Sequence, residues 1–414
     1  MLQPGSGIKA ILTDWPVRLV MSVQNPNAEQ IFNMIRRQGP VSRADIARCT
    51  GLTPPTVTNI TNRLLEAGLV TDYMIGASSG GRRPLLLKIN PAAGQVIIVH
   101  IRSFKMTAYV VDAAFGVQAE FTVNIQGLGH EIVLQQILAI IDRCRQAANG
   151  PLTAVGVVIR GPVRSKEGIS VFAPNIGWKN IPLKYIIEEK NRVPVFIEND
   201  SHVLAYGEYY FGVAREANNL VLLKVGHGIG SGILFNGVLY RGINGSAGEV
   251  GHTVIDVNGP LCSCGNCGCM EALASETALV HAVVQAIRAG QPSLITDIVK
   301  KDLAAVTPEA VYYAADCGDH LASVMLIRVA GYLGMGIANL VNIFNPELIV
   351  IGGGLAKARK YIEEKVWETV ALRSFESCSS ILEIKYSTQT SENTMKGAAD
   401  MVFSELAGQI TEGN

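Results

Sequence analysis

The stretch Gly245–Ser275, GSAGEVGHTVIDVNGPLCSCGNCGCMEALAS, decides how the rest of the chain is interpreted. It contains one histidine, four cysteines and two glutamates, with glycines that allow near neighbours in sequence to reach one ion. Thiolate and imidazole together are the donors that tetrahedral Zn²⁺ prefers. Because nothing after Cys269 resembles a vacant catalytic position, we predict a structural zinc site with these ligands: His252, Cys262, Cys264 and Cys269.

Two alternatives for this cluster stay open. The cysteines could form disulfides, but a chain of 414 residues with 8 cysteines and no recognisable signal peptide is expected in the reducing cytoplasm. Cys267 forms a CxxC pair with Cys264, so it could replace Cys262 or Cys269 as a ligand. Spacing alone does not decide which three cysteines bind the metal.

The same stretch resembles the ROK family, which groups sugar-responsive bacterial repressors with sugar kinases. The resemblance rests on ExGH at Glu249–His252 followed by CxCGxxGCxE at Cys262–Glu271, and it extends roughly over residues 28–405. It implies that the histidine and the cysteines of CxC and GC bind zinc. It also implies that Glu249, His252 and Glu271 hold sugar hydroxyls.

Residues 28–90 have the pattern of a winged helix-turn-helix. Helical spacing of apolar residues begins at Ala28, and Ser42 and Thr53 are suited to cap a second and a third helix, with Gly51 turning the chain between them. The third helix is expected to bury one apolar stripe, formed by Val57, Ile60, Thr61, Leu64 and Leu65. Residues 76–84, GASSGGRRP, would form the tip of a wing.

Short polar side chains on the third helix suit contacts with base edges and phosphates in a major groove, and arginines on the wing suit a minor groove or phosphates. A helical bundle used for dimerisation is the alternative. The segment SRADIARCTGLTPPTVTNI and the GGRRP wing also resemble the DNA-binding heads of ROK repressors, which the family's kinases lack. The candidate DNA-binding residues are Ser42, Arg43, Thr53, Thr56, Thr58, Asn59, Asn62, Arg63, Arg82 and Arg83.

Composition and charge agree with a DNA-binding head fused to a domain that binds a small molecule. The chain is 48% hydrophobic and 17% charged, with no apolar run that we expect to span a bilayer. Residues 1–90 carry ten basic and five acidic residues, a net charge of +5, and the net charge of zero for the whole chain leaves −5 for the remainder.

After Asn90-Pro91, strands alternate with helices in a way that fits a two-lobed actin-like or hexokinase-like ATPase architecture of the α/β class. We expect an N-terminal arm over residues 1–27, the winged head over 28–90, a first lobe over 91–218 and a second lobe with the zinc loop over 219–392. A final helix over about 393–407 would return to the first lobe. Strands are expected at Val96–Ile101, Thr107–Asp112, Thr153–Ile159, Val193–Ile197 and Leu348–Ile351, and helices at about 130–148, 271–290 and 320–345.

Carboxylates and amides bind adjacent sugar hydroxyls, and two further segments supply such groups. Asn175 lies in a tight turn, and Asn199 and Asp200 follow an apolar strand. For each residue alone, a turn or helix-cap role is equally compatible with the sequence. The resemblance to ROK proteins implies sugar contacts for the whole set: Asn175, Asn199, Asp200, Glu249, His252 and Glu271.

The chain departs from the kinases of the family at the positions that handle ATP. Those kinases open the first lobe with DxGxT, and the corresponding positions here are His100, Arg102 and Phe104. The glycine-rich stretch Gly226–Gly232 carries His227 where the kinases usually have threonine, and a glycine-rich loop by itself is a weak signal. We therefore expect no enzymatic activity.

The sequence thus predicts a cytoplasmic, sugar-responsive transcriptional repressor that contains structural zinc. It would bind double-stranded operator DNA as a homodimer or homotetramer, respond to a monosaccharide and have no membrane association. A ROK sugar kinase and a regulator controlled by a partner protein are the alternatives. The identity of the sugar is left open, with a neutral pentose or hexose favoured because no cationic cluster marks a phosphate subsite.

Overall fold

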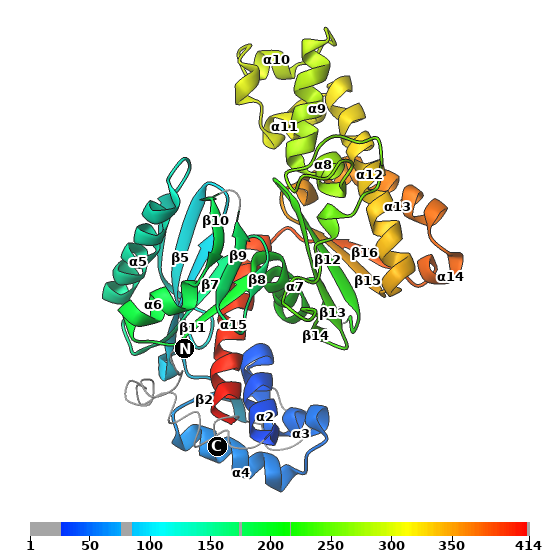
Figure 1. The fold of residues 1–414 in the computed structure, drawn as a ribbon. Helices are drawn as coiled ribbons and strands as arrows, with labels where there is room; N and C mark the ends of the chain where they lie inside the picture. The colour runs from blue at the N-terminus through cyan, green and yellow to red at the C-terminus, as the bar shows by residue number, and fades with distance from the viewer. Residues whose placement is uncertain (1–25, 76–84, 174–175, 216, 412–414) are drawn as a thin grey trace. The chain divides into compact units, whose positions relative to one another are not determined.

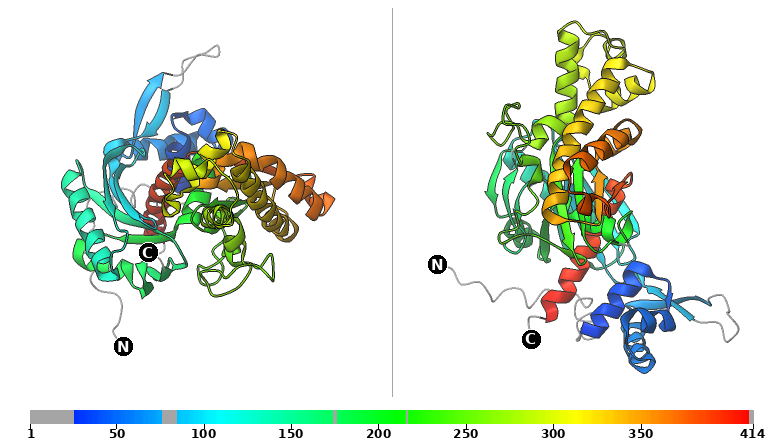
Figure 2. Two further views of the ribbon diagram at one scale, coloured as in Figure 1. Left: turned by 90° about the horizontal axis from the view of Figure 1, so that it is seen from above. Right: turned by 90° about the vertical axis from the view of Figure 1, so that its right-hand side faces the viewer.

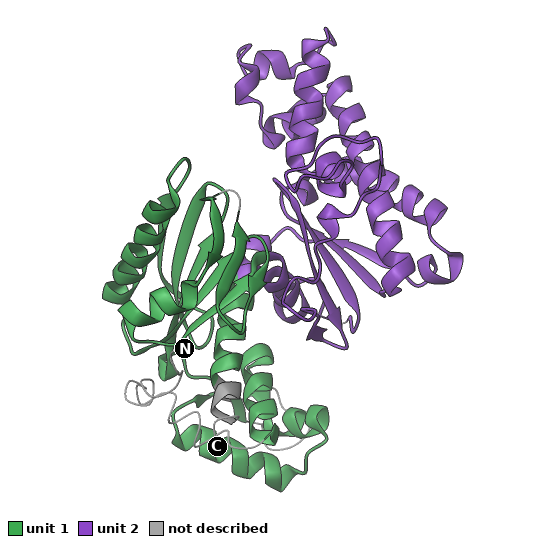
Figure 3. Ribbon diagram, in the orientation of Figure 1, with its two compact units in different colours: residues 1–200, 395–414 green, residues 201–394 purple. Residues whose placement is uncertain are grey.

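The computed structural model describes residues 26–75, 85–173, 176–215 and 217–411 (Figure 1). It divides into two compact units, residues 1–200 together with 395–414, and residues 201–394 (Figure 3). The expected boundary between the lobes, at residues 218–219, lies later than this division. Most of the expected N-terminal arm, and the expected wing tip at 76–84, lie outside the described residues.

The head has the predicted winged helix-turn-helix. The Oγ atom of Ser42 accepts a hydrogen bond from the Asp45 amide, Gly51 closes the following helix in the left-handed conformation (φ 71°), and Thr53 caps the third helix. The three short strands form a sheet in the order β1-β3-β2. The elements are α2 (Pro26–Gln38), β1 (Val41–Ser42), α3 (Arg43–Thr50), α4 (Pro54–Glu66), β2 (Val70–Ile75) and β3 (Leu85–Ile89).

Apolar residues at helical spacing hold the head together. On α4, the predicted stripe is buried at Val57, Ile60, Thr61 and Leu64, whereas Leu65 is only half-buried. Spacings of three and four residues place these side chains on one face of the helix, toward α2 and α3. The opposite face of α4 therefore stays available to a partner.

The first unit contains a five-stranded sheet in the order β11-β7-β4-β5-β6. Strands β4, β7 and β11 run parallel to one another, and β5 and β6 extend the sheet as an antiparallel meander. A smaller sheet has the order β10-β9-β8. The strands are β4 (Gln95–Ile101), β5 (Lys105–Asp112), β6 (Val117–Asn124), β7 (Leu152–Ile159), β8 (Val163–Arg164), β9 (Ile169–Ala173), β10 (Trp178–Ile181) and β11 (Val195–Asn199).

The central strands of this sheet are buried because both faces are covered. Every residue of β4 is buried, as expected of an apolar strand that lies between layers. Residues of α5 (His130–Ala147) and α6 (Leu183–Asn191) share a core with this sheet that also contains the fully buried Trp178. A short 3₁₀ helix, η2 (Pro91–Ala93), joins the head to β4.

The second unit repeats the same topology. Its sheet has the order β14-β13-β12-β15-β16, with β12, β15 and β16 parallel and β13 and β14 antiparallel at one side. Each strand thus has a counterpart in the first unit, β12 with β4 and β13 with β5. The strands are β12 (Leu220–Val225), β13 (Ile229–Phe235), β14 (Val238–Leu239), β15 (Leu348–Gly352) and β16 (Glu383–Tyr386).

The second unit contains helices that, apart from α7, contribute residues to one large core. They are α7 (Asp200–Phe211), η4 (Val250–His252), α8 (Met270–Ala274), α9 (Glu276–Arg288), α10 (Ile295–Ile298), η5 (Leu303–Ala305), α11 (Pro308–Asp316), α12 (His320–Phe344), η6 (Gly354–Ala358), α13 (Arg359–Arg373) and α14 (Glu376–Ser379). Contrary to the sequence expectation, α12 is long and apolar enough to cross a membrane by length and composition alone. More than half of its most apolar window is buried within the core, so α12 is a core helix and does not indicate a membrane protein.

Two helices cross the division between the units. Helix α7 begins with Asp200, the last residue of the first unit, and continues in the second. The last helix, α15 (Thr390–Thr411), begins in the second unit and belongs to the first from Met395 onward. It spans the expected helix at 393–407 and extends beyond it at both ends.

Candidate functional site

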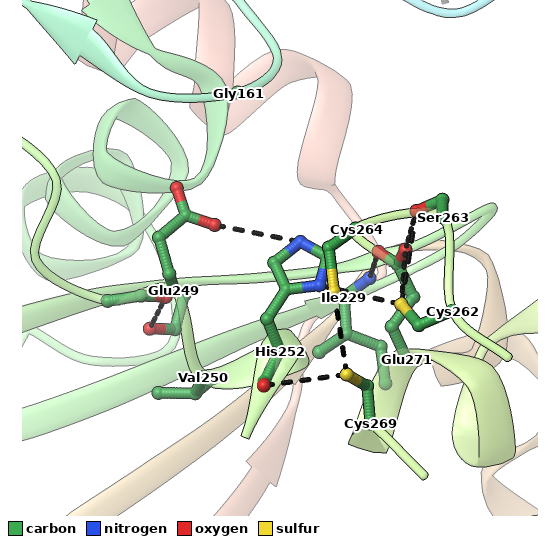
Figure 4. A network of polar contacts seen from close by, with 12 residues as sticks. Gly161, Ile229, Glu249, Val250, His252, Cys262, Ser263, Cys264, Cys269 and Glu271 are labelled. Carbon is green, nitrogen blue, oxygen red and sulfur yellow. Dashed lines mark hydrogen bonds and ion pairs between the residues drawn. The ribbon is translucent and has the colours of Figure 1, made fainter. Parts of the chain in front are cut away.

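The predicted zinc ligands lie together in the second unit. The possible ligand atoms of His252, Cys262, Cys264 and Cys269 are all within 4.8 Å of one another. The Nδ1 atom of His252 lies 3.6 Å from Sγ of Cys262, and the Sγ atoms of Cys264 and Cys269 are also 3.6 Å apart (Figure 4). Cys267 is not a member of this group.

These separations fit one tetrahedral ion. A Zn–S bond of about 2.3 Å and a tetrahedral angle place two sulfur ligands about 3.8 Å apart, close to the observed distances. The four donors come from η4, from the loop before α8 and from the residue that precedes α8. The cluster therefore has the donor atoms and the spacing of a site that could hold a metal ion.

The thiols of the cluster differ in acidity. A hydrogen bond from the backbone at Asn266 lowers the pKa of Cys264, whereas burial raises the pKa of Cys269 to about 12. A metal binds thiolates, so its charge must displace the proton of Cys269. Cys264 is therefore the readier thiolate of the two, and Cys269 loses its proton only when a cation binds beside it.

The glutamate of the GCxE motif is fixed beside the cluster. Oε2 of Glu271 accepts a hydrogen bond from the Ile229 amide at 2.9 Å, and Oε1 accepts one from Oγ of Ser263 at 3.1 Å. Glu271 is only 8% exposed. The hydrogen bond from Ser263 therefore connects the loop that carries the cysteines with the Glu271 carboxylate. The sequence did not point to Ser263, because a serine in a glycine-rich loop carries no specific signal.

The ExGH segment lies against β13. A Cβ atom at Gly251 would collide with the carbonyl oxygen of Ile229, so this position requires glycine. Oε2 of Glu249 lies 4.0 Å from Nε2 of His252, and both side chains are about one-third exposed. His252 thus presents Nδ1 to the cysteines and Nε2 toward Glu249 (Figure 4).

The six candidate sugar residues fall into separate groups. Glu249, His252 and Glu271 lie together in the second unit. Asn199 and Asp200 end β11 and begin α7 at the boundary of the first unit, where both are buried and Nδ2 of Asn199 donates to the carbonyl of Gly161 at 2.8 Å. The sixth, Asn175, lies outside the described residues.

The third helix of the head presents polar side chains to solvent. Thr53, Thr58, Asn59, Asn62 and Arg63 are exposed, and Thr56 is half-buried. The hydroxyls of Thr53 and Thr56 lie 2.8 Å apart, and that of Thr58 donates to the carbonyl of Pro54. These contacts restrain short side chains on one face of α4, which suits contacts with base edges.

The two predicted contacts at the start of α3 have structural partners. Ser42 is 5% exposed, and its hydroxyl donates to the carboxylate of Asp45, which lowers the pKa of that carboxyl. Arg43 donates through Nε to Thr61 and through its guanidinium to Oδ1 of Asn62. Arg43 therefore connects α3 to α4. Arg82 and Arg83 lie outside the described residues.

The positions that replace the kinase DxGxT motif offer no carboxylate. His100 is buried at the end of β4, and Arg102 and Phe104 follow in the turn to β5. The guanidinium of Arg102 lies 3.4 Å from Nδ1 of His100. Asp112 lies at the opposite end of the β4–β5 hairpin, paired with Gln95, and its carboxylate accepts hydrogen bonds from the amides of Ala114 and Gly116, so it shapes a turn there.

The glycine-rich turns of the second unit lie against a carboxylate of the chain itself. The Glu276 amide donates to the Gly226 carbonyl at 2.8 Å, and its Oε1 accepts from Oη of Tyr312 at 2.8 Å. A Cβ at Gly354 would collide with this carboxylate, and burial raises the pKa of Glu276. Phosphate-binding glycine turns leave space beside their amides for an anion, whereas here the Glu276 side chain occupies the space beside Gly354.

Fold and site together define a DNA-binding head joined to a two-lobed body with a cysteine and histidine cluster. The ROK family model matches residues 97–405, and the MarR family model matches residues 25–77. The chain therefore belongs to the ROK family and carries a DNA-binding head of the MarR type, as the sequence motifs indicated.

Curated relatives match over nearly the whole chain. The xylose repressor of Caldicellulosiruptor bescii is 33% identical over 376 residues, which cover 88% of this chain and 92% of the relative. The xylose repressor of Bacillus subtilis is 30% identical and covers 94% of this chain and 98% of the relative. The DNA-binding transcriptional dual regulator NagC of Escherichia coli is 32% identical and covers 88% of this chain and 86% of the relative.

Solved structures confirm the predicted architecture. A ROK family transcriptional regulator, homologous to the E. coli MLC protein, matches 96% of this chain and 100% of its own with a TM-score of 0.79 at 28% identity. A ROK family glucokinase from Streptomyces griseus, in complex with glucose and AMPPNP, matches 74% of this chain and 99% of its own, with a TM-score of 0.66 at 28% identity. Nearly all of the kinase is thus matched by about three quarters of this chain.

Proposed function

We propose that this protein is a sugar-responsive transcriptional repressor. The observation that carries the proposal is the combination of two features in one chain. A winged helix-turn-helix exposes a polar face of α4, and a ROK body keeps Glu249, His252 and Glu271 together while it replaces the residues that handle ATP. The first feature suits DNA and the second suits sugar binding without catalysis.

DNA recognition would use α4 in the major groove of the operator. The exposed amides and hydroxyls match the donors and acceptors of base edges. Arginines at the wing would add contacts with phosphates or the minor groove. We propose these DNA-binding residues: Arg43, Thr53, Thr56, Thr58, Asn59, Asn62, Arg63, Arg82 and Arg83. Ser42, which the sequence also suggested, is buried and caps α3, so its role is structural.

The effector would be a neutral monosaccharide. Relatives are named for xylose and for N-acetylglucosamine, and both are uncharged sugars that present adjacent hydroxyls. Carboxylates and amides accept and donate to such hydroxyl pairs. We propose contacts from Asn175, Asn199, Asp200, Glu249, His252 and Glu271.

The metal would be Zn²⁺, held by His252, Cys262, Cys264 and Cys269. The donor set is typical of structural zinc, and four protein ligands leave no position for substrate. Its role would be to fix the loop that carries Ser263, which donates to Glu271. Zinc would thereby position one side of the sugar site.

The protein would act in the cytoplasm as a homodimer or homotetramer, since two heads on one assembly can contact two half-sites of an operator. We assign DNA binding to residues 28–90, sugar binding to lobes over 91–218 and 219–392, and leave residues 1–27 as an arm. Sugar would change DNA affinity only if it binds the DNA-competent and DNA-incompetent states with different affinity.

The test is fluorescence anisotropy on DNA from upstream of the protein's own gene, repeated with a panel of neutral and phosphorylated sugars. We expect specific binding and release by one neutral sugar. Tight, salt-sensitive binding that no sugar alters would instead favour control by a partner protein. Absence of specific DNA binding would overturn the proposal.

A further inference from the structure

Two of the basic residues of the head do not face solvent. Arg36 and Arg37 lie in the last turn of α2, and both form ion pairs with Asp400 of α15, a residue 363 or more positions later in the chain. The guanidinium of Arg36 lies 3.0 Å from Oδ1 of Asp400, and that of Arg37 lies 2.9 Å from Oδ2. All three belong to the first unit, where α2 and α15 lie side by side (Figures 1 and 2).

This contact is buried. The side chain of Asp400 is 0% exposed and that of Arg36 is 1% exposed. Arg36 also donates to Oγ of Ser404 at 2.7 Å, and its guanidinium carbon lies 5.7 Å from the ring centres of both Phe32 and Phe403. Arg36 therefore cannot serve as a contact to DNA phosphate while it occupies this position.

A buried ion pair of this kind contributes more to the relative orientation of α2 and α15 than to the free energy of unfolding. Desolvation of the charges offsets much of their attraction, so a well-packed apolar contact would hold the two helices at least as firmly. The Asp400 carboxylate forms an ion pair with Arg36 through Oδ1 and hydrogen bonds with Arg37 through Oδ2, which together favour one relative orientation of α2 and α15. The cluster thus defines one docked position of the head on α15.

The first turn of α15 belongs to the second unit and has polar partners there. Nδ2 of Asn393 donates to Oε1 of Glu208 at 2.8 Å, and the hydroxyl of Ser387 donates to the same oxygen. Glu208 lies on α7 and is 0% exposed. Helix α7 begins at Asp200, one of the proposed sugar contacts.

A single continuous helix therefore joins two buried polar contacts. One contact, at Asn393, connects α15 with the helix that starts at Asp200, and the other, at Asp400, connects α15 with the last turn of α2. The two contact residues on α15 are seven positions, or about two helical turns, apart on one uninterrupted helix. Within the head, α2 packs in turn against α4.

We propose that Asp400 is a positioning residue that couples the sugar-bound state of the body to the DNA-binding head through Arg36 and Arg37. The inference rests on the proposed function, because it names the route by which the sugar would change DNA affinity. Sugar binding shifts α7 and α15, the Arg36–Arg37–Asp400 cluster transmits the shift to α2, and the orientation of α4 changes with it. The proposal predicts that the cluster is needed for the response and not for sugar binding.

The experiment compares wild type with Asp400→Asn, which keeps the size of the side chain and removes its charge, and with Glu405→Gln, which changes an exposed carboxylate on the same helix. For each, sugar affinity is measured by calorimetry, and DNA affinity is measured with and without sugar. Allosteric coupling is commonly about 5- to 150-fold. The ratio of the DNA affinity without sugar to that with sugar should be the same in Glu405→Gln as in the wild type. In Asp400→Asn we expect this ratio to fall below about 2-fold, while the sugar affinity stays within about 3-fold of the wild-type value.

Arg37→Ala provides a second variant for the case in which Asp400→Asn unfolds the head, because it leaves the Arg36–Asp400 ion pair in place. We expect an intermediate ratio from it. The coupling proposal alone would be overturned if Asp400→Asn and Arg37→Ala both kept the wild-type change of DNA affinity with sugar. It would also be overturned if these variants lost sugar binding together with that change. A wild-type protein whose DNA affinity no sugar changes would overturn both the coupling and the proposed function.

Discussion

Nδ1 of His252 lies 3.6 Å from Sγ of Cys262, while Nε2 of the same ring lies 4.0 Å from a carboxylate oxygen of Glu249. One imidazole therefore connects the metal cluster with the exposed end of the proposed sugar site. A metal bound through Nδ1 would leave Nε2 protonated and able to donate to a carboxylate or a sugar hydroxyl. Zinc and sugar responses should consequently be linked.

The Cys264→Ser variant should lose zinc and the sugar response together. A hydroxyl is a poor substitute for a thiolate ligand, so the zinc content should fall from about one ion per chain to below ~0.2. Zinc is measured by mass spectrometry of the purified protein, and the response by release of DNA. Cys267→Ser is the matched control, because Cys267 lies outside the four-residue group and should keep zinc. Stoichiometric zinc in Cys264→Ser would contradict the ligand assignment.

The Glu249→Gln variant should weaken sugar binding and leave zinc in place. Glu249 is about one-third exposed, so a ligand can reach its carboxylate. Hydrogen bonds to charged groups contribute about 1.5–3 kcal/mol, and we expect a loss of about 10- to 100-fold in affinity. Calorimetry measures the affinity, with Glu383→Gln, an exposed carboxylate on β16, as the control. Equal affinities in the two variants would remove Glu249 from the site.

The Asn59→Ala variant should lose specificity for the operator. The amide of Asn59 is exposed on α4, and a side-chain contact with a base edge contributes about 1–3 kcal/mol of discrimination. Anisotropy on operator and scrambled DNA should show the ratio of affinities falling by roughly 5- to 150-fold. Gln30→Ala removes an exposed amide from α2 and should leave the ratio unchanged. An equal loss on both DNAs would indicate a contact to phosphate instead.

Local sequence signals were sufficient for the elements and for the metal cluster. The caps at Ser42 and Thr53 and the apolar stripe of α4 follow from neighbours within one or two turns. The four residues of the metal cluster are close in sequence; spacing left Cys267 open as an alternative, and the resemblance to ROK proteins implied the set that the structure brings together. Strand β6 was not predicted, since its alternating half-buried and exposed residues carry a weaker apolar signal than those of β4.

Contacts between distant segments were beyond sequence reasoning. Arg36 and Arg37 were counted as part of a basic head, and nothing near Asp400 indicates that it binds them. The position of Glu276 beside Gly226 and Gly354 likewise depends on how α9 packs against two strand ends. Both features require the three-dimensional fold, because the partners have no local pattern in common.

The protein should show no ATP-dependent phosphorylation of any sugar that it binds. Phosphoryl transfer needs groups that hold Mg²⁺ and neutralise phosphate charge. At the DxGxT positions the chain has His100 and Arg102 instead of the acidic residue and the glycine, and the carboxylate of Glu276 lies beside Gly354. A coupled assay for ADP, with a ROK family glucokinase as the positive control, should give a rate equal to that without protein. Sugar-dependent ADP formation that scales with protein concentration would contradict the absence of enzymatic activity.

The Leu64→Ala variant should destabilise the head without altering the sugar site. Leu64 is 0% exposed in the stripe of α4, and removal of a buried leucine side chain costs about 2–5 kcal/mol of the free energy of unfolding. The matched control is Leu65→Ala, since Leu65 is half-buried and should cost distinctly less. The stability of the head is measured from the loss of DNA binding as denaturant is added. The sugar affinity of the body is measured by calorimetry. Equal destabilisation by the two variants would contradict the assignment of the buried face of α4, and lower sugar affinity in Leu64→Ala would show that the body depends on the packing of the head.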